Sequence, residues 1–267
     1  MNNMGLAMRL RGGELLLGCS LNEARDPGTV HVLGAAGIDV VFLDLEHNLH
    51  GPETVLDLIG HARAAGVELL VRPPYQDRSM ITRLLDGGCT SLLVPRVRTP
   101  AELAEVLEQA YYHPRGRRGV AMVGGAGGGY RPVPDVRAEM ARANEATLVG
   151  LVVETAEALD VLDELLAEGV GLAVVGFQDL AQALGLPGQP DHPRVREAVT
   201  HVRERCLAAG VSYGVFEPSA ARIGPEVAAG AQLVVHGGVF AYLRAGVARA
   251  VAALDEARNA CSAPAQR

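Results

Sequence analysis

Short apolar runs rich in β-branched residues recur along the chain, and a longer stretch rich in Ala, Leu, Arg and Glu follows most of them. The short runs have the length of strands, and the longer stretches have the spacing of amphipathic helices. Eight alternating units of this kind predict a parallel sheet closed into a single-domain (β/α)8 TIM barrel spanning residues 1–267. We expect strands at residues 14–19, 38–44, 68–72, 91–95, 148–154, 171–176, 211–216 and 232–236.

Helices are expected at residues 52–65, 80–85, 100–110, 156–168, 192–209 and 219–229. Gly37, Gly66 and Gly230 each stand directly before or near the start of a strand. Glycine at such a step ends the preceding helix in a left-handed conformation. The alternative fold, a doubly wound open sheet, predicts a glycine-rich phosphate turn after the first strand, and residues 18–22 do not form one.

Residues 113–144 interrupt this rhythm, because they contain a glycine run at 124–129 and no clear strand. A long insertion between the fourth and fifth strands is typical of a binding loop, so we expect a mobile lid here. Residues 259–267 are expected either to fray or to pack on a neighbouring molecule.

The composition is that of a globular protein, with 49% hydrophobic and 21% charged residues in 267. A net charge of −7 without a basic block argues against nucleic-acid binding. The apolar runs are too short and too interrupted to span a membrane, and the N-terminus lacks the pattern of a secretory signal. Four cysteines without pairing motifs (Cys19, Cys89, Cys206 and Cys261) favour free thiols, so we expect a cytoplasmic protein.

In a barrel of this type the active site lies at the C-terminal ends of the strands. The second strand ends at Asp44, and Glu46 and His47 follow it. Three ionisable groups after an apolar strand are costly unless they face a polar cavity, and a histidine near a carboxylate is the usual arrangement of a general base. The alternative is a cluster that caps the helix after Gly51.

Three further strands end in charged residues. Arg72 ends the third strand and offers a fixed set of donors for a carboxylate or an enolate oxygen, with a structural salt bridge as the alternative. Glu154 and Asp179 follow the fifth and sixth strands and could share one divalent cation. Oxygen ligands favour Mg²⁺ or Mn²⁺. Asp179 could equally cap a helix at residues 180–184.

Several of these segments, in their order and spacing between Gly18 and Ala250, resemble the HpcH/HpaI aldolase family. The resemblance is carried by residues 44–47, 71–74, 84–88, 91–95, 113–120, 153–155, 176–180 and 188–193. It implies a metal-dependent class II pyruvate aldolase on a TIM barrel of the phosphoenolpyruvate/pyruvate type. Members of the family are similar in exchanging a C-terminal helix between subunits, here residues 240–267, and many are hexamers built as trimers of dimers.

The resemblance also implies roles for individual residues. Glu154 and Asp179 would hold Mg²⁺ or Mn²⁺, with Co²⁺ as a further candidate. Arg72 would bind the 2-oxo acid and stabilise its enolate, and His47, oriented by Asp44, would act as the base directly or through a water. The remaining assignments are Glu46 beside the metal's waters, Gly176, Phe177 and Gln178 as substrate-binding residues, and Asp86 near the site, contributed across a subunit boundary.

The chain departs from the family pattern on the side of the aldehyde partner. Val152 replaces a glutamine, Phe177 adds bulk beside the metal aspartate, and the glycine-rich insertion replaces larger residues. His236 stands where members have a smaller residue, and it could bind substrate or carry protons. The alternative for His236 is an ordinary hydrogen-bonded loop residue. These departures predict a changed acceptor with a conserved 2-oxo acid site.

The chain contains no lysine, so all 24 basic residues are arginine and a Schiff-base aldolase is excluded. The expected reaction is therefore metal-dependent cleavage of a 4-hydroxy-2-oxo acid to pyruvate, or a related 2-oxo acid, and an aldehyde. One alternative is a citryl-CoA or malyl-CoA type of lyase, with Arg115, Arg117 and Arg118 as a phosphate groove. A second is a non-catalytic paralogue that binds an oxo acid.

Overall fold

The computed structural model describes residues 5–74 and 77–262. Eight parallel strands pair in sequence order, and β8 pairs with β1 to close the barrel. This confirms the predicted (β/α)8 fold and excludes the open sheet. The strands are β1 (Leu16–Ser20), β2 (Val40–Asp44), β3 (Glu68–Arg72), β4 (Ser91–Val94), β5 (Leu148–Val153), β6 (Leu172–Val175), β7 (Ser212–Phe216) and β8 (Leu233–Gly238).

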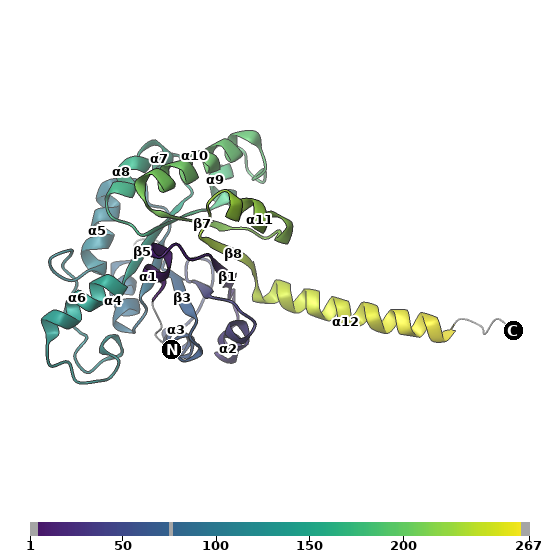
Figure 1. Ribbon diagram of the computed structural model, residues 1–267, viewed down its shortest axis with the longest axis horizontal. Coiled ribbons are helices and arrows are strands. Elements are labelled where there is room, and N and C mark those ends of the chain that lie inside the picture. The colour runs from purple at the N-terminus through teal and green to yellow at the C-terminus, as the bar shows by residue number, and fades with distance from the viewer. Residues whose placement is uncertain (1–4, 75–76, 263–267) are drawn as a thin grey trace.

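Helices surround the barrel, as Figure 1 shows. The long ones follow the predicted stretches closely, and two of them, α3 and α5, have the predicted limits. The helices are α1 (Leu6–Arg11), α2 (Gly28–Ala35), α3 (Pro52–Ala65), α4 (Arg78–Asp86), α5 (Pro100–Ala110), α6 (Val136–Ala146), α7 (Ala156–Asp160), α8 (Leu162–Ala167), α9 (Phe177–Ala183), α10 (Pro193–Ala209), α11 (Ala220–Ala228) and α12 (Val239–Ser262), with a 3-10 turn, η1 (Ala126–Gly128).

Two helical regions differ from the prediction. The single helix expected at residues 156–168 is divided into α7 and α8 at Val161, whose φ of −117° and ψ of 24° lie outside the helical region. The insertion at residues 113–144 contains most of α6, which begins at an Asp135 side chain that accepts from the Ala138 N–H. That capping aspartate was a sequence signal for the helix.

The strands alternate between two apolar cores. On β2, Val40 and Phe42 point into the barrel, whereas Val41 and Leu43 face the helices outside. Helix α1 contributes apolar side chains to the inner core, so it closes the N-terminal end of the barrel. Since the N-terminal end is closed, ligands have access to the interior from the C-terminal ends of the strands.

Glycines follow three of the helices in the predicted left-handed conformation, and Gly37 does so after α2 with a φ of 94°. Gly66 ends α3 with a φ of 71°, and Gly230 follows α11 with a φ of 107°. Side chains other than glycine rarely adopt this conformation. Cys19, Cys89 and Cys206 are free and buried, as expected, and the side chain of Cys261 lies outside the described part. Within the described residues no helix is long and apolar enough to cross a membrane.

The glycine-rich segment does not cover the mouth of its own barrel, although the sequence predicted a lid. Gly127 packs on the backbone of α4, where an added Cβ would lie 3.4 Å from the Asp86 carbonyl oxygen. The segment also closes on itself, because the Tyr130 N–H donates to the Gly125 carbonyl. Its residues 127–129 line a separate cavity beside α3 and α6.

Candidate active site

A cavity of about 430 Å³ lies at the C-terminal ends of the strands. It is lined by residues at the ends of β1, β2, β3 and β7 and by residues that follow β2, β5, β6 and β7. The predicted residues in its lining are Asp44, His47, Arg72, Glu154, Gly176, Phe177, Gln178 and Asp179.

Asp44 and Arg72 form a buried ion pair at one side of this cavity. The register of β2 and β3 places the two residues directly beside each other. The Arg72 Nε and Nη2 groups donate to the two Asp44 carboxylate oxygens at 2.8 and 2.7 Å. Burial opposes ionisation of Asp44, but the guanidinium outweighs it and keeps the pKa of Asp44 below its usual value. Arg72 is thus held in one orientation.

The expected pairing of the His47 ring with Asp44 does not form. Asp44 accepts from the His47 main-chain N–H at 3.4 Å, and its carboxylate is occupied by Arg72. The His47 ring instead lies beside Glu46, with 3.7 Å between Nε2 and Oε2. A guanidinium on the neighbouring strand provides two parallel charged hydrogen bonds, which a histidine ring cannot match.

Glu154 follows β5, and Asp179 lies on α9, which follows the neighbouring strand β6. The main-chain N–H of Arg96 donates to Glu154 Oε1 at 2.8 Å. Glu154 Oε2 faces Gly176, at which an added Cβ would lie 3.1 Å from that oxygen. Asp179 lies in the first turn of α9, whose N-cap is Gly176, so it does not cap the helix. Likewise, Gly51 rather than the 44–47 cluster caps α3.

These carboxylates fit a divalent cation. Burial, and then the negative charges of Glu46 and Asp179, raise the pKa of Glu154 to about 7 against the donated Arg96 N–H. Glu46 Oε2 is buried and has no hydrogen-bond partner among the described residues. A cation near these oxygens would stabilise the ionised form of Glu154 and would give Glu46 Oε2 a partner. Within the described residues no group of three or more His, Cys, Asp and Glu side chains gathers, so waters and substrate would complete the coordination.

Three predicted site residues lie outside the cavity lining. Glu46 borders it and pairs with the Arg96 Nε at 2.7 Å. His236 lies on β8, where its Nδ1 bonds to the Glu217 carbonyl oxygen at 2.8 Å, which is the alternative role foreseen for it. Asp86 ends α4 and pairs with Arg118 at 2.8 Å. It lies outside the cavity because a residue that precedes β4 lies at the N-terminal end of the barrel. A role for Asp86 across a subunit boundary stays a prediction.

Sequence reasoning missed several residues of the lining. Glu217 is 2% exposed and pairs with the Arg222 Nε at 2.9 Å. Ser20 ends β1 and Glu217 follows β7, so the strand-end rule applied to those strands would have found both. The full set of missed lining residues is Ser20, Phe42, Pro190, Asp191, Phe216, Glu217, Pro218 and Arg222.

Comparisons with known proteins agree with this geometry. A sequence model of the HpcH/HpaI aldolase/citrate lyase family matches residues 22–241. A hydroxypyruvate/pyruvate aldolase of Sagittula stellata is 32% identical over 84% of this chain and 87% of its own. A 5-keto-4-deoxy-D-glucarate aldolase of Salmonella paratyphi C is 32% identical over 78% and 80% of the two chains.

Comparison of the fold with solved structures supports the same family. The crystal structure of an HpcH/HpaI aldolase from Desulfitobacterium hafniense superposes with a TM-score of 0.88 and 32% sequence identity, and covers 95% of this chain and 97% of its own. The match of the family model over most of the chain and the identity to named aldolases both place the chain in one group. The protein belongs to the HpcH/HpaI aldolase/citrate lyase family and is an aldolase-type carbon–carbon lyase.

Proposed function

We propose that the protein is a divalent-metal-dependent aldolase that reversibly cleaves a 4-hydroxy-2-oxo acid to pyruvate and an aldehyde. The observation that carries this proposal is the presence of Arg72, Glu154 and Asp179 in one cavity at the strand ends. The names of two relatives, a hydroxypyruvate/pyruvate aldolase and a 5-keto-4-deoxy-D-glucarate aldolase, support the same class of substrate.

Glu154 and Asp179 would hold the cation, and their oxygen atoms favour Mg²⁺ or Mn²⁺. When bound, the cation supplies a Lewis acid that stabilises negative charge on the 2-oxo acid. Because Gly176 has no side chain, Glu154 Oε2 is unobstructed on the side that faces this residue. A larger residue at this position would place a Cβ against that oxygen.

Arg72 would bind the oxo acid. Asp44 occupies its Nε and one hydrogen of Nη2, and Nη1 lies 3.4 Å from Glu46 Oε2. A guanidinium has five N–H donors, so donors remain for the substrate. Because Asp44 fixes the group before substrate arrives, Arg72 can stabilise the enolate oxygen without reorganisation.

His47 would accept the proton of the C4 hydroxyl. As that proton leaves, the C3–C4 bond breaks, the aldehyde forms, and the electron pair delocalises onto the C2 oxygen as an enolate. His47 then returns the proton to C3, directly or through a water, which yields pyruvate. The His47 ring is half exposed, and its Nε2 lies 3.7 Å from Glu46 Oε2. This role is compatible with general-base catalysis.

We also propose that the protein is a homo-oligomer in which α12 packs on a second copy. Helix α12, yellow in Figure 1, projects from the barrel. Phe240, Leu243, Val247, Val251 and Leu254 recur along it at helical spacing, and all five are exposed in the single chain. Such an apolar stripe is typical of a helix that is buried in an assembly. A hexamer built as a trimer of dimers is the arrangement expected from the family.

A CoA-dependent lyase is less well supported. The arginines considered for a phosphate groove are committed elsewhere, with Arg117 paired to Glu108 and Arg118 to Asp86. Arg115 stacks on the Tyr111 ring at 3.7 Å. None of the three lines the cavity at the strand ends.

A retro-aldol assay tests the proposal. The purified protein is stripped with a chelator, supplied with Mg²⁺ or Mn²⁺, and given a series of 4-hydroxy-2-oxo acids while pyruvate release is followed. We expect release only with metal, and loss of release in Glu154→Gln. Glu139→Gln changes a similarly buried carboxylate on α6 and should keep activity. Pyruvate release that survives the chelator, or that Glu154→Gln leaves intact, would contradict the proposal.

A further inference from the structure

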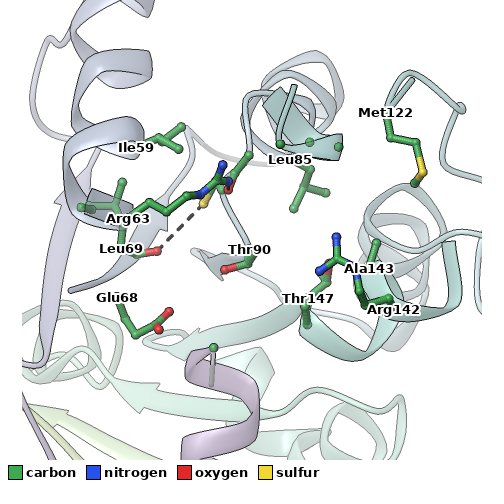
Figure 2. Close-up of a pocket in the computed structure, with 18 of the residues that line it drawn as sticks. Ile59, Arg63, Glu68, Leu69, Leu85, Thr90, Met122, Arg142, Ala143 and Thr147 are labelled. Atoms are coloured by element: carbon green, nitrogen blue, oxygen red, sulfur yellow. Dashed lines mark hydrogen bonds between the residues drawn. The ribbon is translucent and has the colours of Figure 1, made fainter. Parts of the chain in front are cut away.

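A second cavity, of about 400 Å³, lies at the opposite end of the barrel from the candidate active site. Glu68, which lines it, begins β3, whereas Arg72 ends the same strand. Four residues of extended chain separate the two side chains by about 13 Å along the strand. Figure 2 shows Glu68, Thr90 and Thr147, at the N-terminal ends of β3, β4 and β5, with Arg63 on α3 and Arg142 on α6 around the same space.

The lining of this cavity carries an excess of positive charge. Arg63, Arg118, Arg131 and Arg142 contribute guanidinium groups, and Glu68 is the carboxylate in the same lining. Glu139 pairs with both Arg131 and Arg142, and Asp86 pairs with Arg118. The Arg63 side chain donates a hydrogen bond of 3.0 Å to the Gly88 carbonyl oxygen, and within the described residues no carboxylate pairs with it.

Two buried donors in this lining have no partner among the described residues. Arg118 is 9% exposed, and its Nε has no hydrogen-bond acceptor, although Nη2 is bonded to Asp86. Tyr112 is 1% exposed, and its hydroxyl is likewise unpaired. The Arg118 guanidinium lies over the Tyr112 ring at 4.5 Å, so the two donors share one corner of the cavity. Buried polar groups in native proteins nearly always have a partner.

The remaining polar groups suit an acidic ligand. Thr90 and Thr147 add hydroxyl groups at the strand ends. Burial raises the pKa of Glu68, against a hydrogen bond from the Leu6 main-chain N–H and the charge of Arg9. Uncompensated arginine, unpaired donors and hydroxyls are the groups that bind carboxylate and phosphate oxygens.

We propose that this cavity, formed by α3, α4, η1 and α6 at the N-terminal ends of β3–β5, is a second ligand site that binds a small oxyanion, a carboxylate or phosphate group. The Arg118 Nε and the Tyr112 hydroxyl donate to its oxygens, and Arg63 supplies the neutralising charge. The site is separate from the candidate active site, and it does not depend on the reaction proposed there.

Isothermal titration calorimetry with the intact, metal-loaded protein tests this inference, with inorganic phosphate and succinate as separate probes at millimolar concentration. We expect at least one probe to bind, and binding to weaken by at least about tenfold in Arg63→Gln and in Tyr112→Phe, the loss expected for one hydrogen bond to a charged group. Binding of phosphate alone identifies a phosphate site, and binding of succinate alone identifies a carboxylate site.

Two controls separate this cavity from other effects. Tyr213→Phe removes another buried tyrosine hydroxyl, on β7, that has no partner in the described part of the chain, and it should leave binding unchanged. Arg72→Ala alters the candidate active site and should also leave it unchanged. Tyr112→Phe removes only an unpaired hydroxyl, so the variant is expected to fold. The inference is overturned if neither probe binds, or if Arg72→Ala abolishes binding that Tyr112→Phe and Arg63→Gln leave intact.

Discussion

The buried pair of Asp44 and Arg72 gives a prediction whose size can be worked out. In Asp44→Asn the amide keeps one acceptor for the guanidinium but turns its NH₂ group toward the other N–H donor. Removing one partner of a buried ion pair costs about 3–5 kcal/mol. One acceptor is retained, and Glu46 Oε2 lies 3.4 Å from Arg72 Nη1. We therefore expect Asp44→Asn to lower the free energy of unfolding by about 3 kcal/mol, the lower end of this range.

The same substitution should slow catalysis, because Arg72 would no longer be fixed where the enolate oxygen develops. Loss of one preorganised donor to an oxyanion typically lowers kcat by about 10²- to 10³-fold. Urea denaturation measures the first effect, and retro-aldol kinetics measure the second. The pH dependence of kcat should keep its shape, since Asp44 positions Arg72 and His47 is the proposed base.

Asp39→Asn provides the matched control. Asp39 precedes the same strand at its other end and pairs with the Arg9 Nη2 at 2.7 Å. This variant should lose stability and keep kcat. If Asp44→Asn is destabilised but keeps kcat within about twofold, the pair is only structural and the positioning role of Asp44 is refuted.

Three other variants test separate parts of the structure. Gly176→Ala places a Cβ 3.1 Å from Glu154 Oε2 and should weaken Mn²⁺ binding by about tenfold in calorimetry; unchanged affinity would argue against Glu154 as a ligand. Arg142 lowers the pKa of Glu139 to about 2 from 4.5, so Glu139→Gln should lose stability above pH 4.5, and the difference from the native protein in urea denaturation should vanish as the pH falls toward 2; a pH-independent difference would refute the ion pair. Val251→Asp on α12 should reduce the mass measured by light scattering, and an unchanged mass would exclude this helix from the interface.

Much of the barrel could be predicted because local signals decide it. Apolar runs of strand length defined all eight strands, most of them with glycine or proline at their limits, and Pro52 and Pro100 marked the starts of α3 and α5. Arg72 and Glu154 could be predicted as site residues because each is a charged residue at the end of an apolar strand, which is also a local signal. The break at Val161 carries no comparable signal, because a single valine is tolerated in many helices.

The predictions that were wrong concern contacts between neighbouring strands and between segments that are distant in the sequence. The choice of Arg72 rather than His47 as the partner of Asp44 follows from the register of β2 and β3, which the sequence does not specify. The position of the glycine-rich segment beside α4 depends on packing between distant segments. The role expected for Asp86 requires a second copy of the chain, so it stays a prediction.

The central claim is that this cavity forms an enolate from a 2-oxo acid with the help of a divalent cation. Exchange of the pyruvate methyl protons in D₂O, followed by NMR, measures that step without any aldehyde. We predict exchange with Mg²⁺ or Mn²⁺, none with EDTA, and none in Arg72→Ala or His47→Ala. Exchange that persists in EDTA, or its absence with every divalent metal tried, would contradict the account.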